Sequence, residues 1–559
     1  MTATKGARRP VVVGSLVGTL VGLVVLGPAL APGYTLHYDL VFVPDLPLSA
    51  RTLGTDGSVP RAVPNDLVVA LLGTVLPGWL VHKLVLLGCF VVGGAGAGAL
   101  ARTLPGAAAG AVLLTWNPWV GERLGIGHWG YLIGYAVLPW VLVAATGPRS
   151  PRRRALLVAA LTVAALGGST PGVIATLLAA VAVLVADGSL RERAHRLALV
   201  VGVALLANAA WWWPFLRTAS RAADPGGATA FAAAADTPFG ILGSLVLGGG
   251  LWNDRTWFVE RSAWPASAAA LVAVVVVLGL SWSRREWWRD PRTRAATVAG
   301  VVGLVLAALA ALPGGRSLLE AVVTGVPGGG LLRDGQKFAA LWALLLVVAL
   351  THLVDRMASV SLPVHLLLVA IAWPVATLPT LAWGHSGAWG SVEYPAELRD
   401  VSTRLAASGE PVAVFPWSTY RRYAWNDDRV VLDPWNRLLP QTVVSDDRLP
   451  LRDRTVAGED RASDEVTRAL AEDPADVVPV LRGLGVRWVV VQTDQPSPAG
   501  SVPDLDGVPV QRVGDLRVAD LGAPQQVDVE PDRLRGLGLV GTGLAVVLAL
   551  GLVVRHRRT

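Results

Sequence analysis

An acidic residue among aromatic residues, close to the end of the first apolar run, is the first position in the chain that suggests chemistry. Asp39 follows that run and lies between Tyr38 and Phe42. A carboxylate held beside aromatic rings and the lipid boundary would have a raised pKa and could act as a general base. The spacing leaves open a solvated loop aspartate or a helix cap.

Charged residues in later segments form a second set of candidates. Arg333 and Lys337 are four residues apart, so on a helix they would share one face. There they would bind a lipid phosphate, the arginine through bidentate hydrogen bonds. Snorkelling to the headgroups, or pairing with Asp334, is the alternative. A predicted outer loop contains three further substrate-binding candidates: Glu122, Arg123 and His128.

A metal site and a sugar-binding loop are less firmly indicated. His128 would either orient an acceptor or join Asp39 and Asp45 around a divalent metal, although nothing in the spacing requires a metal, and no other cofactor is indicated. Residues 415–428 interleave aromatic residues with Arg and Asp, including Trp417 and Tyr420. Such a segment is typical of a sugar-stacking loop and also of a surface that packs a domain onto the membrane. We favour packing, with Trp417 and Tyr420 as the substrate-binding candidates if the loop binds sugar.

The composition shows which elements must position these residues. The chain has 559 residues, of which 53% are hydrophobic and 16% charged, whereas a soluble protein has about 25% charged residues. Apolar runs fill 11–383 and return at 536–554, and 385–533 has ordinary soluble composition. We therefore expect a polytopic α-helical membrane domain (1–384), an α/β domain (385–533) and a final helix with a basic tail (534–559).

A membrane span needs about 20 mostly apolar residues, and this criterion predicts twelve spans. They are 11–30, 79–101, 104–120, 128–146, 153–169, 171–187, 197–215, 264–282, 295–312, 338–354, 361–383 and 536–554. The first resembles a signal peptide ending at Ala29-Leu30-Ala31, but it is long for one, so we expect it to stay uncleaved.

Arginine clusters fix the expected orientation. They lie near 149–154, 191–196, 284–294 and 555–558, on alternate connections, which is the positive-inside pattern. We expect both termini in the cytoplasm, 385–533 outside a bacterial cytoplasmic membrane, and long outer loops at 31–78, 214–263 and 313–337. A net charge of +7 distributed in this way argues against nucleic-acid binding.

Short elements are predicted within the outer loops and the α/β domain. Val63-Pro64-Asn65-Asp66 predicts a short helix capped by Asn65 or Asp66, and Ser317 with Glu320 has the spacing of a capping box. In the α/β domain the patterns predict helices over 395–407 and 464–484, and strands over 411–415, 429–432, 486–492 and 508–519.

The order of these features resembles the plan of the GT-C glycosyltransferases, which use sugars carried on polyprenyl phosphates. More closely, Val63-Pro64-Asn65-Asp66, Leu76-Pro77-Gly78-Trp79 and Asn117-Pro118 resemble the membrane half of actinobacterial α-(1→3)-arabinofuranosyltransferases. The segment 332–338 is similar to one in those enzymes and in YfhO-like membrane proteins, and 485–491 is similar to a strand of their outer domains. The chain lacks their large carbohydrate-binding C-terminal region, so the sugar is left open.

The resemblance implies a function. A sugar would pass, with inversion, from a polyprenyl-phosphate donor to an envelope glycan, lipid or protein on the extracytoplasmic side. Asp39 would be the catalytic base, and cations would stabilise the leaving phosphate. The alternative is a non-catalytic envelope protein, either an assembly partner or a polyprenyl-lipid-binding scaffold. A flippase or transporter is less favoured because the charges collect in outer loops rather than at mid-membrane.

Overall fold

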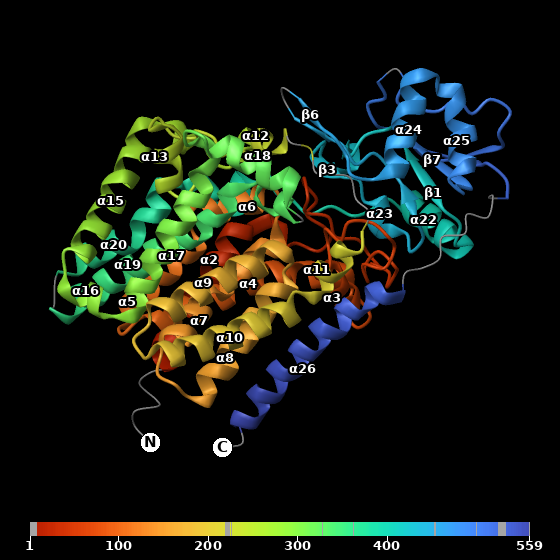
Figure 1. Cartoon of the computed structure of the whole chain (residues 1–559). Coiled ribbons are helices and arrows are strands. Elements are labelled where there is room, and N and C mark those ends of the chain that lie inside the picture. The colour runs from red at the N-terminus through yellow and green to blue at the C-terminus, as the bar shows by residue number, and fades with distance from the viewer. Residues whose placement is uncertain are drawn as a thin grey trace.

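The computed structural model is a long helical bundle with a small sheet domain at one end (Figure 1). It describes residues 8–218, 224, 226–326, 328–360, 363–451, 454–498, 500–523 and 533–557. Within these residues, the N-terminal end of the first helix and the C-terminal end of the last lie at the same end of the bundle, opposite the sheet domain (Figure 1).

Among the described residues, seven helices are long and apolar enough to cross a membrane. They are α2 (Arg8–Leu26), α4 (Gly78–Leu100), α7 (Trp129–Thr146), α15 (Trp264–Trp282), α17 (Pro291–Ala308), α19 (Ala339–Ser359) and α26 (Leu537–Arg557). Two bent pairs raise the count to nine: α10 (Leu190–Ala207) with α11 (Ala209–Leu216), and α20 (Val364–Thr377) with the segment that ends in α21 (Ala382–Ser386). The chain is therefore a multi-pass membrane protein.

Three of the twelve predicted spans correspond to shorter helices: α5 (Leu104–Thr115), α8 (Pro151–Leu166) and α9 (Ser169–Val185). An α-helix rises about 1.5 Å per residue, so the 12 residues of α5 are too few to cross a hydrocarbon core of about 30 Å. It ends where Asn117 caps α6 (Pro118–Gly125) by accepting a hydrogen bond from the Val120 amide at 3.1 Å. The total of twelve spans remains a prediction.

Glycines bring the first two spans into close contact. Gly14 and Gly18 of α2 face Gly94 and Gly98 of α4, and a Cβ at any of the four would overlap the opposing backbone. Small residues four apart let membrane helices approach closely. This packing fixes α2 against α4, and therefore fixes where the first outer loop leaves the bundle.

The sheet domain, which the sequence predicts to lie outside the membrane and which we call the outer domain, contains a five-stranded sheet in the order β4-β1-β7-β9-β8. The strands are β1 (Val412–Phe415), β4 (Val443–Val444), β7 (Trp488–Gln492), β8 (Val510–Val513) and β9 (Leu516–Asp520). β1 runs parallel to β4 and β7, whereas β9 is antiparallel to β7 and β8. The domain also contains α22 (Ala396–Ser408), α23 (Trp435–Leu438), α24 (Arg461–Glu472) and α25 (Val477–Gly483).

Two predictions for this domain need correction. The strand predicted over 508–519 is a hairpin, because the chain turns at Gly514, whose φ is +57°. The helix predicted over 464–484 is two helices, because Pro474 follows the end of α24 and opens a separate 3-10 turn. Both interruptions occur at residues that break regular structure.

The two short helices predicted in the outer loops are present as α3 (Asn65–Gly73) and α18 (Gly315–Gly325), but their predicted caps are not. The loop predicted over 214–263 also contains α12 (Gly227–Ala230), α13 (Gly240–Val246) and α14 (Val259–Ser262), and α16 (Arg285–Arg289) lies at the other end of the bundle. Pro64 precedes α3, and Asp66 instead pairs with Arg437 at 3.1 Å. The capping-box prediction is wrong because α18 starts earlier, at Gly315, after Gly314.

Backbone pairing joins the first outer loop to the outer domain. Two antiparallel hairpins complete this domain: β2 (Tyr420–Arg422) with β3 (Val430–Leu432), and β5 (Leu449–Pro450) with β6 (Thr455–Val456). The Tyr38 amide donates to Val430 O at 2.6 Å, and the Leu432 amide donates to Tyr38 O at 2.8 Å. Residue 38 therefore lies beside β3 and brings the next residue, Asp39, toward β2.

Candidate functional site

Asp39 lies where three segments meet. Its Oδ1 accepts a hydrogen bond from the Tyr420 hydroxyl at 2.8 Å, and its Oδ2 lies 3.2 Å from His128 Nε2. Its backbone amide donates to Ile126 O at 3.1 Å. The side chain remains 37% exposed, so a carboxylate that is anchored on both oxygens is still open to a ligand.

Gly127 allows the α6–α7 connection to approach Asp39 this closely. Its φ is +84°, and a Cβ there would overlap the Leu40 amide nitrogen and lie 2.7 Å from the Asp39 carbonyl carbon. Both the conformation and the space favour glycine. The identity of residue 127 therefore positions the carboxylate.

Replacing Gly127 by alanine is expected to move the 39–40 backbone away from the connection. The strained φ alone costs about 1–3 kcal/mol, so a lower thermal midpoint is expected in detergent. Gly202 provides a matched control, because a Cβ there meets nothing within 4 Å. Equal thermal midpoints for Gly127→Ala and Gly202→Ala would contradict the close approach.

The contacts of His128 define the roles of its two ring nitrogens. Arg123 Nη1 lies 2.9 Å from His128 Nδ1, and a guanidinium can only donate. Nδ1 therefore accepts from Arg123, and Nε2 donates to Asp39. In this arrangement the imidazole ring links the carboxylate to Arg123.

Arg123 extends the network into the protein interior. Its side chain is fully buried, and it donates to Asp334 Oδ2 at 2.9 Å and to Gln336 Oε1. Burial would raise the pKa of Asp334, but the charges of Arg123 and Lys337 outweigh burial and lower it. Lys337 is buried too, with its Nζ 3.2 Å from Thr170 Oγ1.

The predicted raised pKa of Asp39 is wrong. Burial would raise the pKa of this carboxyl, but hydrogen bonds from His128 and Tyr420 outweigh burial and lower it. Both partners are brought in by other segments of the fold, which the local sequence around residue 39 does not reveal. Asp39 is therefore ionised near neutral pH, in the form that accepts a proton.

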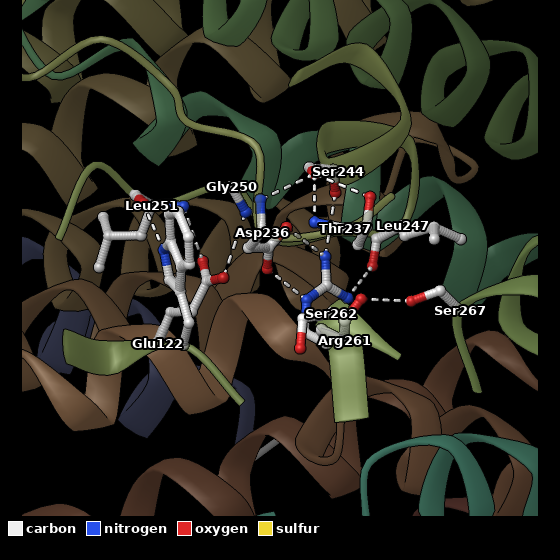
Figure 2. A network of polar contacts seen from close by, with 12 residues as sticks. Glu122, Asp236, Thr237, Ser244, Leu247, Gly250, Leu251, Arg261, Ser262 and Ser267 are labelled. Carbon is white, nitrogen blue, oxygen red and sulfur yellow. Dashed lines mark hydrogen bonds and ion pairs between the residues drawn. The ribbon is translucent and has the colours of Figure 1, made fainter. Parts of the chain in front are cut away.

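Glu122 belongs to an internal network rather than to the open site. It is fully buried and accepts hydrogen bonds from the Gly250 and Leu251 amides at 3.1 and 3.2 Å. Figure 2 shows it beside the buried ion pair of Asp236 and Arg261. Burial and the Asp236 carboxylate raise the pKa of Glu122 well above its usual range. The prediction that Glu122 faces the substrate cavity is therefore corrected.

Arg333 and Lys337 do not share a helix face. Residues 329–332 and 335–338 form two separate 3-10 helices, and α19 begins only at Ala339. Arg333 pairs with Glu459 of the outer domain at 3.2 Å, and Asp334 pairs with Arg123. The glycines at 328–330 and 335 allow this irregular backbone path. The spacing of four residues between Arg333 and Lys337 does not reveal it.

The remaining candidates, Tyr420, Trp417 and Asp45, lie in different environments. Tyr420 reaches Asp39, whereas Trp417 is 6% exposed in the core of the outer domain and donates to Thr467 Oγ1 at 2.9 Å. Trp417 therefore has no open ring face for a sugar, which corrects its predicted role. Asp45 is exposed and lies outside the His128 network. Among the described residues, no group of three His, Cys, Asp or Glu side chains could hold a metal ion.

Sequence reasoning missed two members of this network, Asp334 as the partner of Arg123 and Gln336 as its second acceptor. Both lie in the segment 332–338, in which the sequence predicted site roles only for Arg333 and Lys337. Gln336 also donates to Glu122 Oε2 at 3.2 Å and thereby joins the open site to the internal network. The signal for these two residues in the sequence was a run of polar residues, within 332–338, directly before an apolar span.

Comparison with known proteins identifies the fold. Of six structural matches, one is the arabinofuranosyltransferase AftD from Mycobacteria, with a TM-score of 0.59 and 17% identity, covering 93% of this chain and 40% of AftD. The chain has the AftD fold. Two classes of an AftD mutant match with TM-scores of 0.54 and 0.53, identities of 17% and 16%, and coverage of 93% and 91% of this chain and 42% and 41% of AftD.

The likeness to AftD concerns the fold, and the chain spans about two fifths of the AftD length. No protein-family model and no curated protein sequence matches the chain. The likeness to AftD agrees with the polytopic helical architecture expected from the sequence, in which many apolar helices are followed by a sheet domain and a last apolar helix.

Proposed function

We propose that this chain is a membrane glycosyltransferase that moves a sugar from a polyprenyl-phosphate donor to a cell-envelope acceptor on the extracytoplasmic side. The observation that carries the proposal is the Asp39 carboxylate, which is ionised, partly exposed and oriented on both oxygens within an AftD fold. A base oriented in this way suits attack by a hydroxyl group.

The proposed reaction is a single displacement. The acceptor oxygen bonds to the anomeric carbon while the bond from that carbon to the phosphate oxygen breaks, and Asp39 takes the hydroxyl proton. The leaving lipid phosphate departs as an anion and needs no protonation if cations stabilise it. The buried Lys337 and Arg333, which pairs with Glu459, are the cations proposed for this role.

A non-catalytic scaffold is the second candidate. It is favoured by the same hydrogen bonds, because a carboxylate bound on both oxygens also pins the first outer loop to the outer domain. In that case Asp39 would fix two parts of the protein together, and loss of its charge would affect stability rather than sugar transfer.

Transfer from labelled polyprenyl-phosphate sugars, offered as a panel to the purified full chain with envelope extract, tests the proposal. Incorporation of one sugar would support the enzyme and name its donor. If neither transfer nor donor binding is detected for any sugar while the protein stays folded, the glycosyltransferase proposal fails and the scaffold is retained.

Replacing Tyr420 by phenylalanine tests how the carboxylate is tuned. Loss of a hydrogen bond to a charged group costs about 1.5–3 kcal/mol of stability, so a lower thermal midpoint is expected in detergent. Because Tyr420 helps to lower the pKa of Asp39, its loss raises that pKa. Activity, which requires the ionised form, is then lost at a higher pH as the solution is acidified. An unchanged acid limb of the pH–rate profile would refute this role, and Tyr423→Phe is the control.

A further inference from the structure

A large cavity lies at the end of the bundle opposite the outer domain, far from Asp39. It measures about 690 Å³, within the range of about 300–1,000 Å³ found for small-molecule sites. Its wall is formed by the start of α2, the end of α4, the end of α7, and the starts of α8 and α17. The arginine distribution predicts that this end faces the cytoplasm.

The charge of the cavity is its most informative property. Three arginines line it, Arg102, Arg153 and Arg292, against one acidic residue, Asp290. Asp290 is already engaged, because its Oδ1 accepts a hydrogen bond from the Arg292 amide as the cap of α17, and its Oδ2 lies 3.6 Å from Arg102. The lining therefore carries an excess of positive charge.

Two of the three arginines are held in different ways. Arg153 donates to Val143 O and lies against Gly147, where a Cβ would overlap its guanidinium. Arg102 is anchored by its backbone, whose amide donates to Asp355 Oδ2 at 2.8 Å, while its side chain is 73% exposed at the rim, beside Asp290. One cation is therefore fixed in the wall, and another lies exposed at the rim.

The helix termini add to this field. α8 and α17 both begin at the cavity, and the N-terminal end of a helix carries partial positive charge. Guanidinium groups bind phosphate oxygens through paired hydrogen bonds. Basic cavities between membrane helices on the cytoplasmic side suit the headgroups of anionic lipids.

We propose that this cavity binds a phosphate group, carried by an anionic lipid of the inner leaflet or by a soluble phosphate compound. The inference does not depend on the proposed transferase, because the site is built from other elements and is read out by binding. Its ligand chemistry follows from the arginines, the size of the cavity and the two helix starts.

The test uses the purified full chain in detergent with two kinds of probe. Native mass spectrometry measures retention of cardiolipin and phosphatidylglycerol against phosphatidylethanolamine, and thermal shift measures binding of inorganic pyrophosphate. Arg153→Gln and Arg292→Gln are each expected to weaken binding roughly fivefold, the effect of about one basic residue near an anionic headgroup. Arg285→Gln, an exposed arginine outside the cavity, is the control.

The outcomes distinguish a lipid headgroup from a soluble phosphate compound as the ligand. Retention of anionic lipid that falls in the two variants supports a lipid headgroup, and binding of pyrophosphate that falls in the same variants supports a soluble ligand. Binding that is equal in the variants, the control and the unmodified chain overturns the site, as does no binding of any probe. Arg102→Gln, at the exposed rim, serves if either wall variant fails to fold.

Discussion

Replacing Asp39 by asparagine is expected to lower the rate of sugar transfer by about 10²- to 10⁴-fold, the usual contribution of a positioned general base. The amide has nearly the same shape, and its oxygen can still accept the hydrogen bond from Tyr420. It cannot take a proton from the acceptor. Sugar transfer from the donor found in the panel would measure the effect at saturating acceptor.

Asp45→Asn is the matched control, because Asp45 belongs to the same outer loop but is exposed and outside the network. It should leave transfer within about twofold of the unmodified chain, in keeping with the small effects of surface substitutions. Full activity in Asp39→Asn would contradict the role of Asp39 as base. Loss of donor binding together with activity would instead indicate a structural role for the carboxylate.

Replacing Arg123 by leucine is expected to destabilise the protein by about 3–5 kcal/mol, the cost of breaking a buried ion pair by removing one partner. Arg123 is fully buried, and its loss leaves Asp334 without its ion-pair partner and His128 without its donor. The shift of a chemical unfolding curve in detergent measures this loss. Sugar transfer should fall in the remaining folded protein, because His128 is no longer oriented toward Asp39.

Arg333→Leu is the comparison for this prediction, because its pair with Glu459 is partly exposed. Exposed pairs contribute about 0–1 kcal/mol, so a much smaller shift is expected. The double variant Arg123→Leu with Asp334→Leu should recover part of the stability, since the Asp334 carboxylate is then not left buried without Arg123. Equal shifts for the Arg123 and Arg333 variants would rule out the buried network as the cause.

Sequence predicted the architecture better than the site. Apolar runs identified the membrane helices, and strand patterns found β1, β3 and β7, because burial in lipid or in a sheet leaves a local record in composition and period. Composition and periodicity indicated the bends between α10 and α11, and between α20 and α21, less clearly. Their 68° and 70° angles depend on how the surrounding helices pack.

At the site, sequence singled out Asp39, Arg123, His128 and Tyr420 as separate candidates, and the structure brings them into one network. Which of these residues contact one another could not be predicted, because each hydrogen bond depends on close backbone contacts at other positions, at Gly127 or along β3. The same limitation explains Trp417, since an aromatic residue in a loop and one in a domain core have the same local sequence. The lowered pKa of Asp39 follows from partners that no local pattern identifies.

The hydrogen bond between Tyr420 and Asp39 joins residues that are 381 positions apart, and this separation determines when the site can form during synthesis. Ribosomes add about 5–20 residues per second, so Tyr420 is synthesised roughly 20–80 s after Asp39. During that interval the growing chain already has its first spans in the bilayer but no completed site. A ribosome that stalls before the outer domain would therefore leave an inserted, inert fragment.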